Sequence, residues 1–273
     1  MCIRDRNKVI DQYKLLFLGA GNIATAIIKG LIHSGFSSEN ISVYDKDISK
    51  TALLSKEHKI NVIEKIGLFK NGYVFICVKP SDYSDLLDKV GKYISKDVYI
   101  LSCMAGVSLS KLEKDFEENE CLRLMPNVLI ESGNGFTAAV SQSERLIDDL
   151  RKIFNGASSI SEMPEDMFNL ITASSGSGPA WFYHFINEYI KSVEESGLAA
   201  DDAKAITLSL LNGVAKKVNQ DTDLEELISQ VASPGGTTEA GLTVLEQKNM
   251  KKILHKTINE AAKRSQELLD ENK

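Results

Sequence analysis

Two short glycine-containing stretches of this sequence have the residue types and spacing to bind anionic groups. The first is Gly19-Ala-Gly-Asn-Ile-Ala24, which follows the apolar run 15–18. In a strand–turn–helix unit, the first glycine permits a tight turn, the second lets the backbone approach a pyrophosphate, and a small third residue allows close packing of helix and strand. Free N–H groups and the helix dipole attract phosphates there. The stretch predicts a dinucleotide-binding turn, and the alternative is an ordinary turn that binds nothing.

The second stretch is Ser233-Pro-Gly-Gly-Thr-Thr238, which precedes a helical pattern. Gly235 and Gly236 free the backbone, while Thr237 and Thr238 place hydroxyl and N–H groups at the start of the helix. This arrangement suits a small anion such as a carboxylate. The alternative is a helix-capping loop in which a threonine serves as the cap.

The remaining reactive side chains form no recognisable catalytic or metal-binding set. The four histidines are isolated from one another and from other ligand-type residues, so neither a hydrolytic triad nor a metal site is expected. The four cysteines are scattered without a CxxC pair, which argues against a disulfide framework or a zinc site and favours a reducing compartment. We therefore expect a cytoplasmic protein.

An alternation of strands and helices positions the first stretch. Apolar runs predict strands at 15–18, 41–44, 73–78, 98–102, 121–125 and 136–140, and helical spacing predicts helices at 49–56, 82–94, 110–116 and 144–154. This order predicts an α/β Rossmann domain with a mostly parallel sheet and right-handed crossovers. Ligands of such sheets lie at the carboxyl ends of the strands. We expect a crevice formed by residues 19–24, 45, 78–80, 103–106 and 126–127.

Asp45 stands at the end of the second predicted strand, where a nucleotide-binding fold faces the adenosine ribose. A carboxylate there accepts hydrogen bonds from the ribose hydroxyls and repels a 2′-phosphate, which favours NAD. Lys46 follows directly and could soften that repulsion. An aspartate that caps the turn ahead of the next helix is an equally good interpretation.

Beyond Pro164 nearly all of the sequence has helical periodicity. Helices are predicted at 165–173, 180–196, 201–218, 223–231, 239–245 and 250–269, with breaks at 174–179 and 233–238. We therefore expect three segments: a disordered leader at 1–13, a Rossmann domain at 14–163 and an all-α domain at 164–273. Because glycine loops interrupt the apolar faces of the helical domain, we expect it to dimerise.

The overall composition and net charge limit the kinds of binding partner that we expect. The chain has 273 residues, 43% of them hydrophobic and 26% charged, and its net charge is -6. This charge offers no electrostatic reason to bind nucleic acid or an anionic membrane. Apolar runs are too short for a transmembrane helix.

From about Lys14 to Leu269 the sequence resembles the pyrroline-5-carboxylate reductase family, whose members catalyse the last step of proline synthesis. The resemblance rests on residues 19–24, Val78-Lys-Pro80, Ser102-Cys-Met-Ala-Gly106, Arg123-Leu-Met-Pro-Asn127, Ser175-Gly-Ser-Gly-Pro-Ala180 and, above all, Ser233-Pro-Gly-Gly-Thr-Thr238. It implies NADPH or NADH as coenzyme, 1-pyrroline-5-carboxylate as substrate, and a helical domain that dimerises with interleaved helices, often within larger rings of dimers.

The resemblance also implies roles for individual residues. The coenzyme would contact Gly19, Gly21, Asn22, Ile23 and Ala24 through its pyrophosphate, and Val78, Lys79, Pro80, Met104, Ala105, Gly106 and Asn127 toward its nicotinamide. Thr238 would act at the ring nitrogen of the substrate, with Ser233, Gly235, Gly236 and Thr237 around the substrate carboxylate. Glu165 would contact substrate bound to the partner subunit.

Several positions depart from the family pattern. Val128-Leu129 replaces the usual Thr-Pro, Gln230 replaces a frequent Asn, and Asp45 and Glu64 are acidic where NADP-dependent members usually carry neutral or basic residues. Two other functions remain open. A β-hydroxyacid or related imine reductase is one, although residues 170–175 lack the lysine that hydroxyacid enzymes use. A redox-sensing dinucleotide binder is the other, although it would not need a carboxylate pocket.

Overall fold

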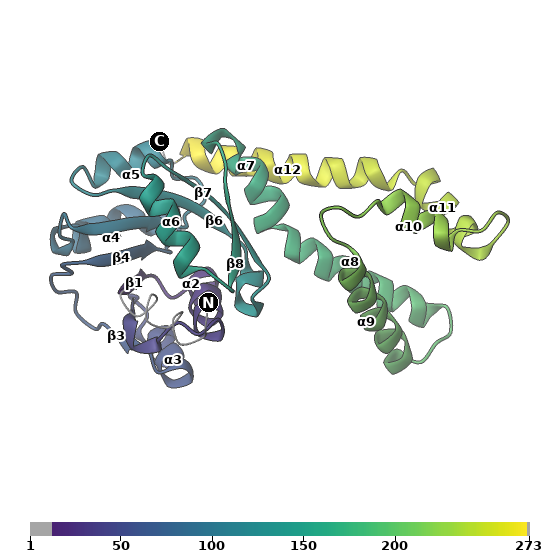
Figure 1. Ribbon diagram of the computed structural model, residues 1–273, viewed down its shortest axis with the longest axis horizontal. Coiled ribbons are helices and arrows are strands. Elements are labelled where there is room, and N and C mark those ends of the chain that lie inside the picture. Colours follow the sequence, from purple (N-terminus) through teal and green to yellow (C-terminus); the bar gives the residue numbers. More distant parts are fainter. Residues whose placement is uncertain (1–12, 272–273) are drawn as a thin grey trace. The chain divides into compact units, whose positions relative to one another are not determined.

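The computed structural model describes residues 13–271 (Figure 1). The predicted leader lies outside the described residues except for Tyr13. That residue is buried, its ring packs edge-on against Tyr73, and its hydroxyl donates a hydrogen bond to Asp149 at 3.1 Å. The folded part of the chain therefore includes Tyr13, and the predicted leader was at least one residue too long.

One eight-stranded sheet forms the framework, with the order β3-β2-β1-β4-β5-β6-β7-β8. All neighbouring strands are parallel except β6 and β7, which are antiparallel. This confirms the predicted Rossmann-type, mostly parallel sheet. The strands are β1 (Leu15–Leu18), β2 (Ile41–Tyr44), β3 (Asn61–Val62), β4 (Gly72–Ile76), β5 (Val98–Ser102), β6 (Cys121–Pro126), β7 (Gly135–Ser141) and β8 (Ser158–Glu162).

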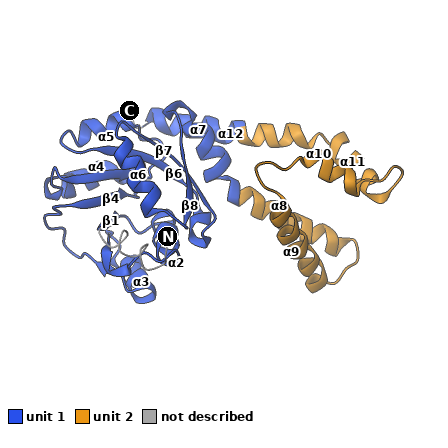
Figure 2. Cartoon of the chain, in the orientation of Figure 1, with its two compact units in different colours: residues 1–179, 259–273 blue, residues 180–258 orange. Residues whose placement is uncertain are grey.

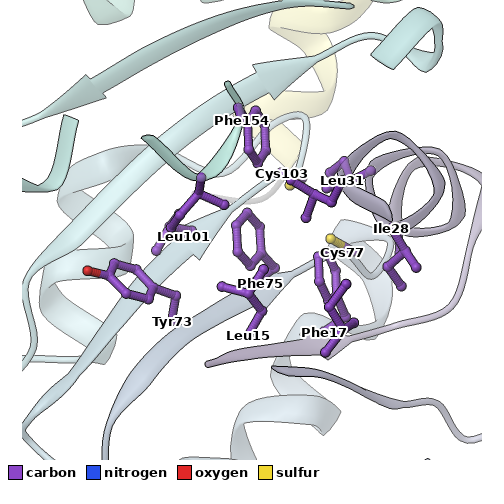
Figure 3. Close-up of a cluster of buried hydrophobic side chains, with 14 of the residues drawn as sticks. Leu15, Phe17, Ile28, Leu31, Tyr73, Phe75, Cys77, Leu101, Cys103 and Phe154 are labelled. Atoms are coloured by element: carbon purple, nitrogen blue, oxygen red, sulfur yellow. The ribbon is translucent and has the colours of Figure 1, made fainter. Parts of the chain in front are cut away.

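Side chains of the central strands alternate between two apolar layers, as the period of two in a strand requires. Leu15 and Phe17 of β1 belong to the layer that includes side chains of α2 (Asn22–His33), α3 (Ile48–His58) and α6 (Glu144–Ile153). Leu16 and Leu18 belong to the opposite layer, with α4 (Tyr83–Val90) and α5 (Leu109–Asp115). Because both faces are covered, these strands are continuously apolar. Figure 3 shows the first layer, where the rings of Phe17 and Phe75 are stacked with their centroids 4.7 Å apart.

Short 3₁₀ helices fill several connections. They are η1 (Ser38–Asn40), η2 (Pro80–Asp82), η3 (Gly91–Tyr93), η4 (Val128–Ser132) and η5 (Glu165–Met167). The predicted helix at 82–94 is thus divided into α4 and η3. The strands β3 and β8 were missed by the sequence prediction, because β3 has two residues and β8 is a polar edge strand with the sequence Ser-Ser-Ile-Ser-Glu.

The α-helix is interrupted near the predicted break at 174–179, but a π-helical turn and a bend at Ser177 replace the predicted loop, and α8 already begins at Gly178. α7 (Phe168–Ile171) continues into a π-helical turn at Thr172–Gly176, and α8 (Gly178–Glu195) follows. Hydroxyl groups satisfy carbonyls of the preceding turn: Thr172 donates to the Phe168 carbonyl at 2.7 Å, and Ser174 donates to that of Leu170 at 2.8 Å. A widened turn explains how a Ser- and Gly-rich segment remains helical.

The chain divides into two compact units (Figure 2). The sheet unit contains the described residues up to Pro179 and those from Asn259 onward, and the helical unit is Ala180–Ile258. These borders differ from the predicted boundary near Met163. Phe168 and Ile171 pack against Met125 and Ala138 of the sheet, which explains why the segment after 163 belongs with the strands.

The C-terminal part of α12 (Met250–Glu271) also belongs to the sheet unit. Asn169 donates to the Gln266 side chain at 2.6 Å and accepts a hydrogen bond from the Ser265 hydroxyl at 2.8 Å.

The helical unit contains most of α8 together with α9 (Ala200–Lys217), α10 (Leu224–Val231), α11 (Thr237–Gln247) and the first part of α12. Every residue of 180–258 is described, and among them only Ala203 and Thr207 are buried. Among the described residues, no helix is both long enough and apolar enough to cross a membrane.

Candidate functional site

The glycine turn between β1 and α2 is built as the sequence predicts. Gly19 has a φ of +105°, and a Cβ at this position would lie 2.7 Å from the Cys77 carbonyl oxygen, so no other residue fits without a backbone shift. Gly21 precedes the first residue of α2 and has no side chain to cap the helix, and a Cβ built on it would meet no atom within 4 Å. The amino end of α2 is therefore accessible to an anion.

Asp45 joins the end of β2 to this turn. Its Oδ2 accepts the Ala20 N–H at 2.7 Å, and its Oδ1 accepts the Asp47 N–H at 2.8 Å. The cap of α3 is Asp47, whose carboxylate accepts the Ser49 N–H at 3.1 Å. Asp45 thus caps the turn that precedes α3, as its alternative interpretation expects, and Asp47 caps the helix itself. The carboxylate of Asp45 is also held beside the glycine turn.

A cavity of about 350 Å³ opens next to the glycine turn at the carboxyl ends of β1, β2 and β4. It brings together five of the predicted coenzyme residues: Gly19, Gly21, Asp45, Val78 and Lys79. The sequence analysis had also noted Lys46 beside Asp45, but it missed Lys50, Asp82, Asp85 and Lys89. The complete lining is Gly19, Gly21, Tyr44, Asp45, Lys46, Lys50, Cys77, Val78, Lys79, Asp82, Asp85, Leu86 and Lys89. The charges that follow Pro80 in the sequence were a signal that could have identified Asp82 and Asp85.

The loop after β5 contains the predicted residues Met104, Ala105 and Gly106, which do not line this cavity. Met104 is buried, and its N–H donates to the Ser102 hydroxyl at 3.3 Å. Gly106 has a φ of +75°, and a Cβ there would lie 3.0 Å from the Leu268 carbonyl group in α12. The loop is therefore held between the sheet and the end of α12.

Asn127, another predicted coenzyme residue, is buried at the end of β6. Its side-chain amide donates to the Ser175 hydroxyl at 3.1 Å, and its Oδ1 accepts the Phe136 N–H at 3.4 Å. Asn127 thus links the β6–β7 connection to the π-helical turn, and no direct role in a crevice follows from these contacts.

An ion pair between a buried arginine and a partly exposed glutamate joins β6 to the segment before α7. Arg123 of β6 is 2% exposed, its Nη1 donates to Glu165 Oε1 at 2.7 Å, and its guanidinium carbon lies 4.7 Å from the centre of the Phe168 ring. The same Glu165 oxygen accepts the Leu109 N–H at the start of α5 at 2.7 Å. Burial lowers the pKa of Arg123, and the Glu165 carboxylate opposes that shift. The structure therefore places Glu165 in a brace between β6 and α5.

Residues 233–238 belong to the helical unit and form the turn that starts α11. The Gly236 N–H donates to the Ser233 carbonyl at 2.9 Å, and the Gly235 N–H donates to the Glu239 carboxylate at 2.6 Å. Gly235 has a φ of +72° and Gly236 directly precedes the helix. Two of the N–H groups of the turn are thus engaged within it, and Thr237 and Thr238 occupy the first two positions of α11.

Two thiols lie at the carboxyl ends of neighbouring strands (Figure 3). Cys77 follows β4 and Cys103 follows β5, and both are buried. Burial raises the pKa of Cys103 well above its usual value, and its hydrogen bond with Cys77 acts in the same direction. No group of three or more metal-ligating side chains is gathered in residues 13–271.

Sequence comparison identifies both parts of the chain. Residues 165–268 match the family model described as pyrroline-5-carboxylate reductase dimerisation, and residues 14–106 match one described as NADP oxidoreductase, coenzyme F420-dependent. A pyrroline-5-carboxylate reductase of Staphylococcus haemolyticus is 31% identical over 270 residues, and one of Staphylococcus aureus is 33% identical over 267 residues; each alignment covers 93% of this chain and 97% of the relative. The chain belongs to the pyrroline-5-carboxylate reductase family.

Solved structures of the family have the same fold. A Plasmodium falciparum pyrroline carboxylate reductase with NADP bound superimposes with a TM-score of 0.84 at 25% identity, covering 94% of this chain and 98% of that one. Membership in the pyrroline-5-carboxylate reductase family confirms the resemblance noted from the sequence motifs. It also makes the chain an NAD(P)H-dependent oxidoreductase with a dimerisation region.

Proposed function

We propose that the chain reduces 1-pyrroline-5-carboxylate to L-proline with NADPH or NADH. The observation that carries this proposal is the identity of 31–33% with named reductases along nearly the whole chain. The cavity supports it, because the open amino end of α2 and the fixed Asp45 suit a pyrophosphate and an adenosine ribose respectively.

The residues of the two predicted binding stretches fit a reaction in which the protein mainly positions the substrate and the coenzyme. Bound NADPH or NADH supplies a hydride. The protonated cyclic imine accepts it at the ring carbon, the C=N electron pair moves to nitrogen, and a neutral secondary amine results without a second proton. A strong general acid is therefore unnecessary. The protein aligns the imine carbon and holds the substrate carboxylate, so catalysis is mainly a matter of orientation.

The turn at 233–238 is our proposed substrate site. Gly235 and Gly236 use their N–H groups within the turn, so a substrate carboxylate would meet the N–H groups of Thr237 and Thr238 and the Ser233 hydroxyl. The hydroxyl of Thr238 would then orient the ring nitrogen. We propose that Asn22, Ile23 and Ala24 contact the pyrophosphate, and that Pro80, Met104, Ala105, Gly106 and Asn127 shape the nicotinamide side, as the family resemblance implies.

Subunit arrangement and location complete the proposal. The dimerisation region supports a homo-oligomer, and we propose a dimer or a ring of dimers in the cytoplasm. The match to the dimerisation model begins at residue 165, close to the boundary at 164 that we predicted for the helical domain. Glu165 would reach the partner's substrate only through Oε2, because Oε1 already binds Arg123 and Leu109.

Thr238→Ala and Thr238→Ser test the substrate site. We expect Thr238→Ala to lower turnover about tenfold without abolishing it, since one orienting hydrogen bond is lost, and Thr238→Ser to retain most of the activity. Oxidation of NADPH and of NADH by pyrroline-5-carboxylate is followed by absorbance. Unchanged kinetics in Thr238→Ala would remove Thr238 from the site, and inactivity of the unmodified enzyme with both coenzymes would refute the proposed reaction.

A further inference from the structure

An ion pair joins two walls of the cavity beside the glycine turn. The Lys46 ammonium donates to the Asp82 carboxylate at 2.6 Å. Lys46 follows directly after Asp45 at the end of β2, and Asp82 is the last residue of η2, beyond β4. Both residues line the cavity. The pair therefore connects the ends of two strands that are separated by β1 in the sheet.

Asp45 makes this lysine important for coenzyme choice. Each oxygen of the Asp45 carboxylate accepts a backbone N–H, so its negative charge is fixed next to the expected ribose position. A 2′-phosphate at that ribose meets this charge and needs a cation close by. Lys46 is the adjacent cation in the sequence, but Asp82 already neutralises it.

The other charges of the cavity do not replace Lys46 directly. Lys50 lies in the first turn of α3, and its ammonium is 3.9 Å from the Asp47 carboxylate, a longer ion pair. Lys79 and Lys89 line the cavity from the side that follows β4, together with Asp85. Among the lysines that line the cavity, only Lys46 both follows Asp45 directly in the sequence and forms an ion pair with an acid of the opposite wall, Asp82.

We propose that Asp82 sets the coenzyme preference, because its carboxylate competes with the 2′-phosphate of NADPH for Lys46. NADH binds with the Lys46–Asp82 pair intact, whereas NADPH gains its phosphate contact only when Lys46 leaves Asp82. The inference rests on the proposed function in one respect, that the cavity holds the adenosine end of the coenzyme.

Asp82→Asn tests this inference, with Asp85→Asn as a matched control. The two substitutions remove the same charge from the same cavity, but only Asp82 binds Lys46. Dissociation constants for NADPH and NADH are measured by coenzyme fluorescence at low salt without substrate. We expect Asp82→Asn to raise the affinity for NADPH relative to NADH about three- to fivefold, which is the size of effect that an exposed ion pair usually has. Asp85→Asn should change this affinity ratio less than about 1.5-fold.

A double-variant cycle identifies Lys46 as the group that is released. In a Lys46→Gln background, Asp82→Asn should no longer change the ratio. Equal shifts in the two aspartate variants, or a shift that persists in Lys46→Gln, would overturn the inference while leaving the proposed reaction intact. Failure of the unmodified protein to bind either coenzyme would instead overturn both.

Discussion

The two compact units bury their apolar residues to very different extents. The sheet unit has two apolar layers, one on each face of the strands, with residues such as Phe17, Phe75 and Leu31 inaccessible to solvent. In the helical unit only Ala203 and Thr207 are buried. Large apolar side chains are exposed on each of its main helices, for example Phe182, Val214, Val231, Val244 and Ile253.

This difference in burial indicates that the two units are stabilised in different ways. A sheet covered on both faces completes its hydrophobic core within one chain. Helices that leave many large apolar side chains exposed need another surface to cover them, because large exposed apolar patches mark interaction sites. The match of residues 165–268 to a dimerisation model indicates that a second copy of the chain supplies that cover.

The largest expected effect comes from charging the exposed apolar surface of the helical unit. Phe182→Glu on α8 should weaken the dimer at least about 30-fold and reduce activity with it, because an aromatic interface residue is replaced by a charge. Sedimentation and activity are measured over a range of protein concentration.

Leu68→Glu is the matched control, because Leu68 is also largely exposed but lies in the sheet unit. It should leave both the dimer and the activity unchanged. Equal behaviour of the two variants would contradict the assignment of the interface to the helical unit.

The next effect tests whether the sheet unit depends on the Arg123–Glu165 ion pair. Glu165→Ala leaves the Arg123 guanidinium buried without its carboxylate and should lower the free energy of unfolding by about 3–5 kcal/mol. Denaturant titration measures the change. Glu131→Ala removes the partner of Lys29 in an exposed pair and should cost at most about 1 kcal/mol. Comparable losses in the two variants would show that the Arg123–Glu165 brace contributes no special stability.

The smallest effect concerns Asp149 and depends on pH. Burial alone would raise the pKa of Asp149, but hydrogen bonds from Tyr73, Lys152 and Tyr13 more than offset it and lower the pKa. The stabilisation is therefore complete above the unfolded-state pKa of about 4 and is lost as pH falls through the folded-state value. Asp149→Asn should destabilise the protein by about 1–2 kcal/mol near neutral pH, and less at lower pH. A difference that stays constant down to pH 3 would refute this assignment.

Most of the sheet unit could be predicted because its signals are local. The runs at 15–18, 41–44 and 98–102 are rich in apolar and β-branched or aromatic residues, and their predicted bounds match β1, β2 and β5. The edge strand β8 was missed because half-exposed polar residues carry no strong periodic pattern. The antiparallel pairing of β6 with β7 depends on the short η4 connection, which periodicity does not describe.

The candidate site was predicted at the strand ends, where Gly19, Gly21, Asp45, Val78 and Lys79 line one cavity, but its ion pairs were not predicted. The glycine turn has its small residues at fixed spacing, so its shape followed from residues 19–24. The Arg123–Glu165 and Lys46–Asp82 pairs join residues 42 and 36 positions apart, and such contacts arise only once the sheet and its connections are assembled. A charged residue inside the apolar run 121–125 was nevertheless a visible signal that Arg123 would need a partner.

The burial of Cys103 has a practical consequence. Thiolates, rather than neutral thiols, react with alkylating agents and peroxide, so this buried thiol with its raised pKa is protected while the strands stay closed. Because Cys103 does not line the cavity beside the glycine turn, its labelling must follow a local opening of this end of the sheet. The alkylation rate of Cys103 therefore reports how often that end opens, and slower labelling in the presence of coenzyme would show that the bound coenzyme keeps it closed.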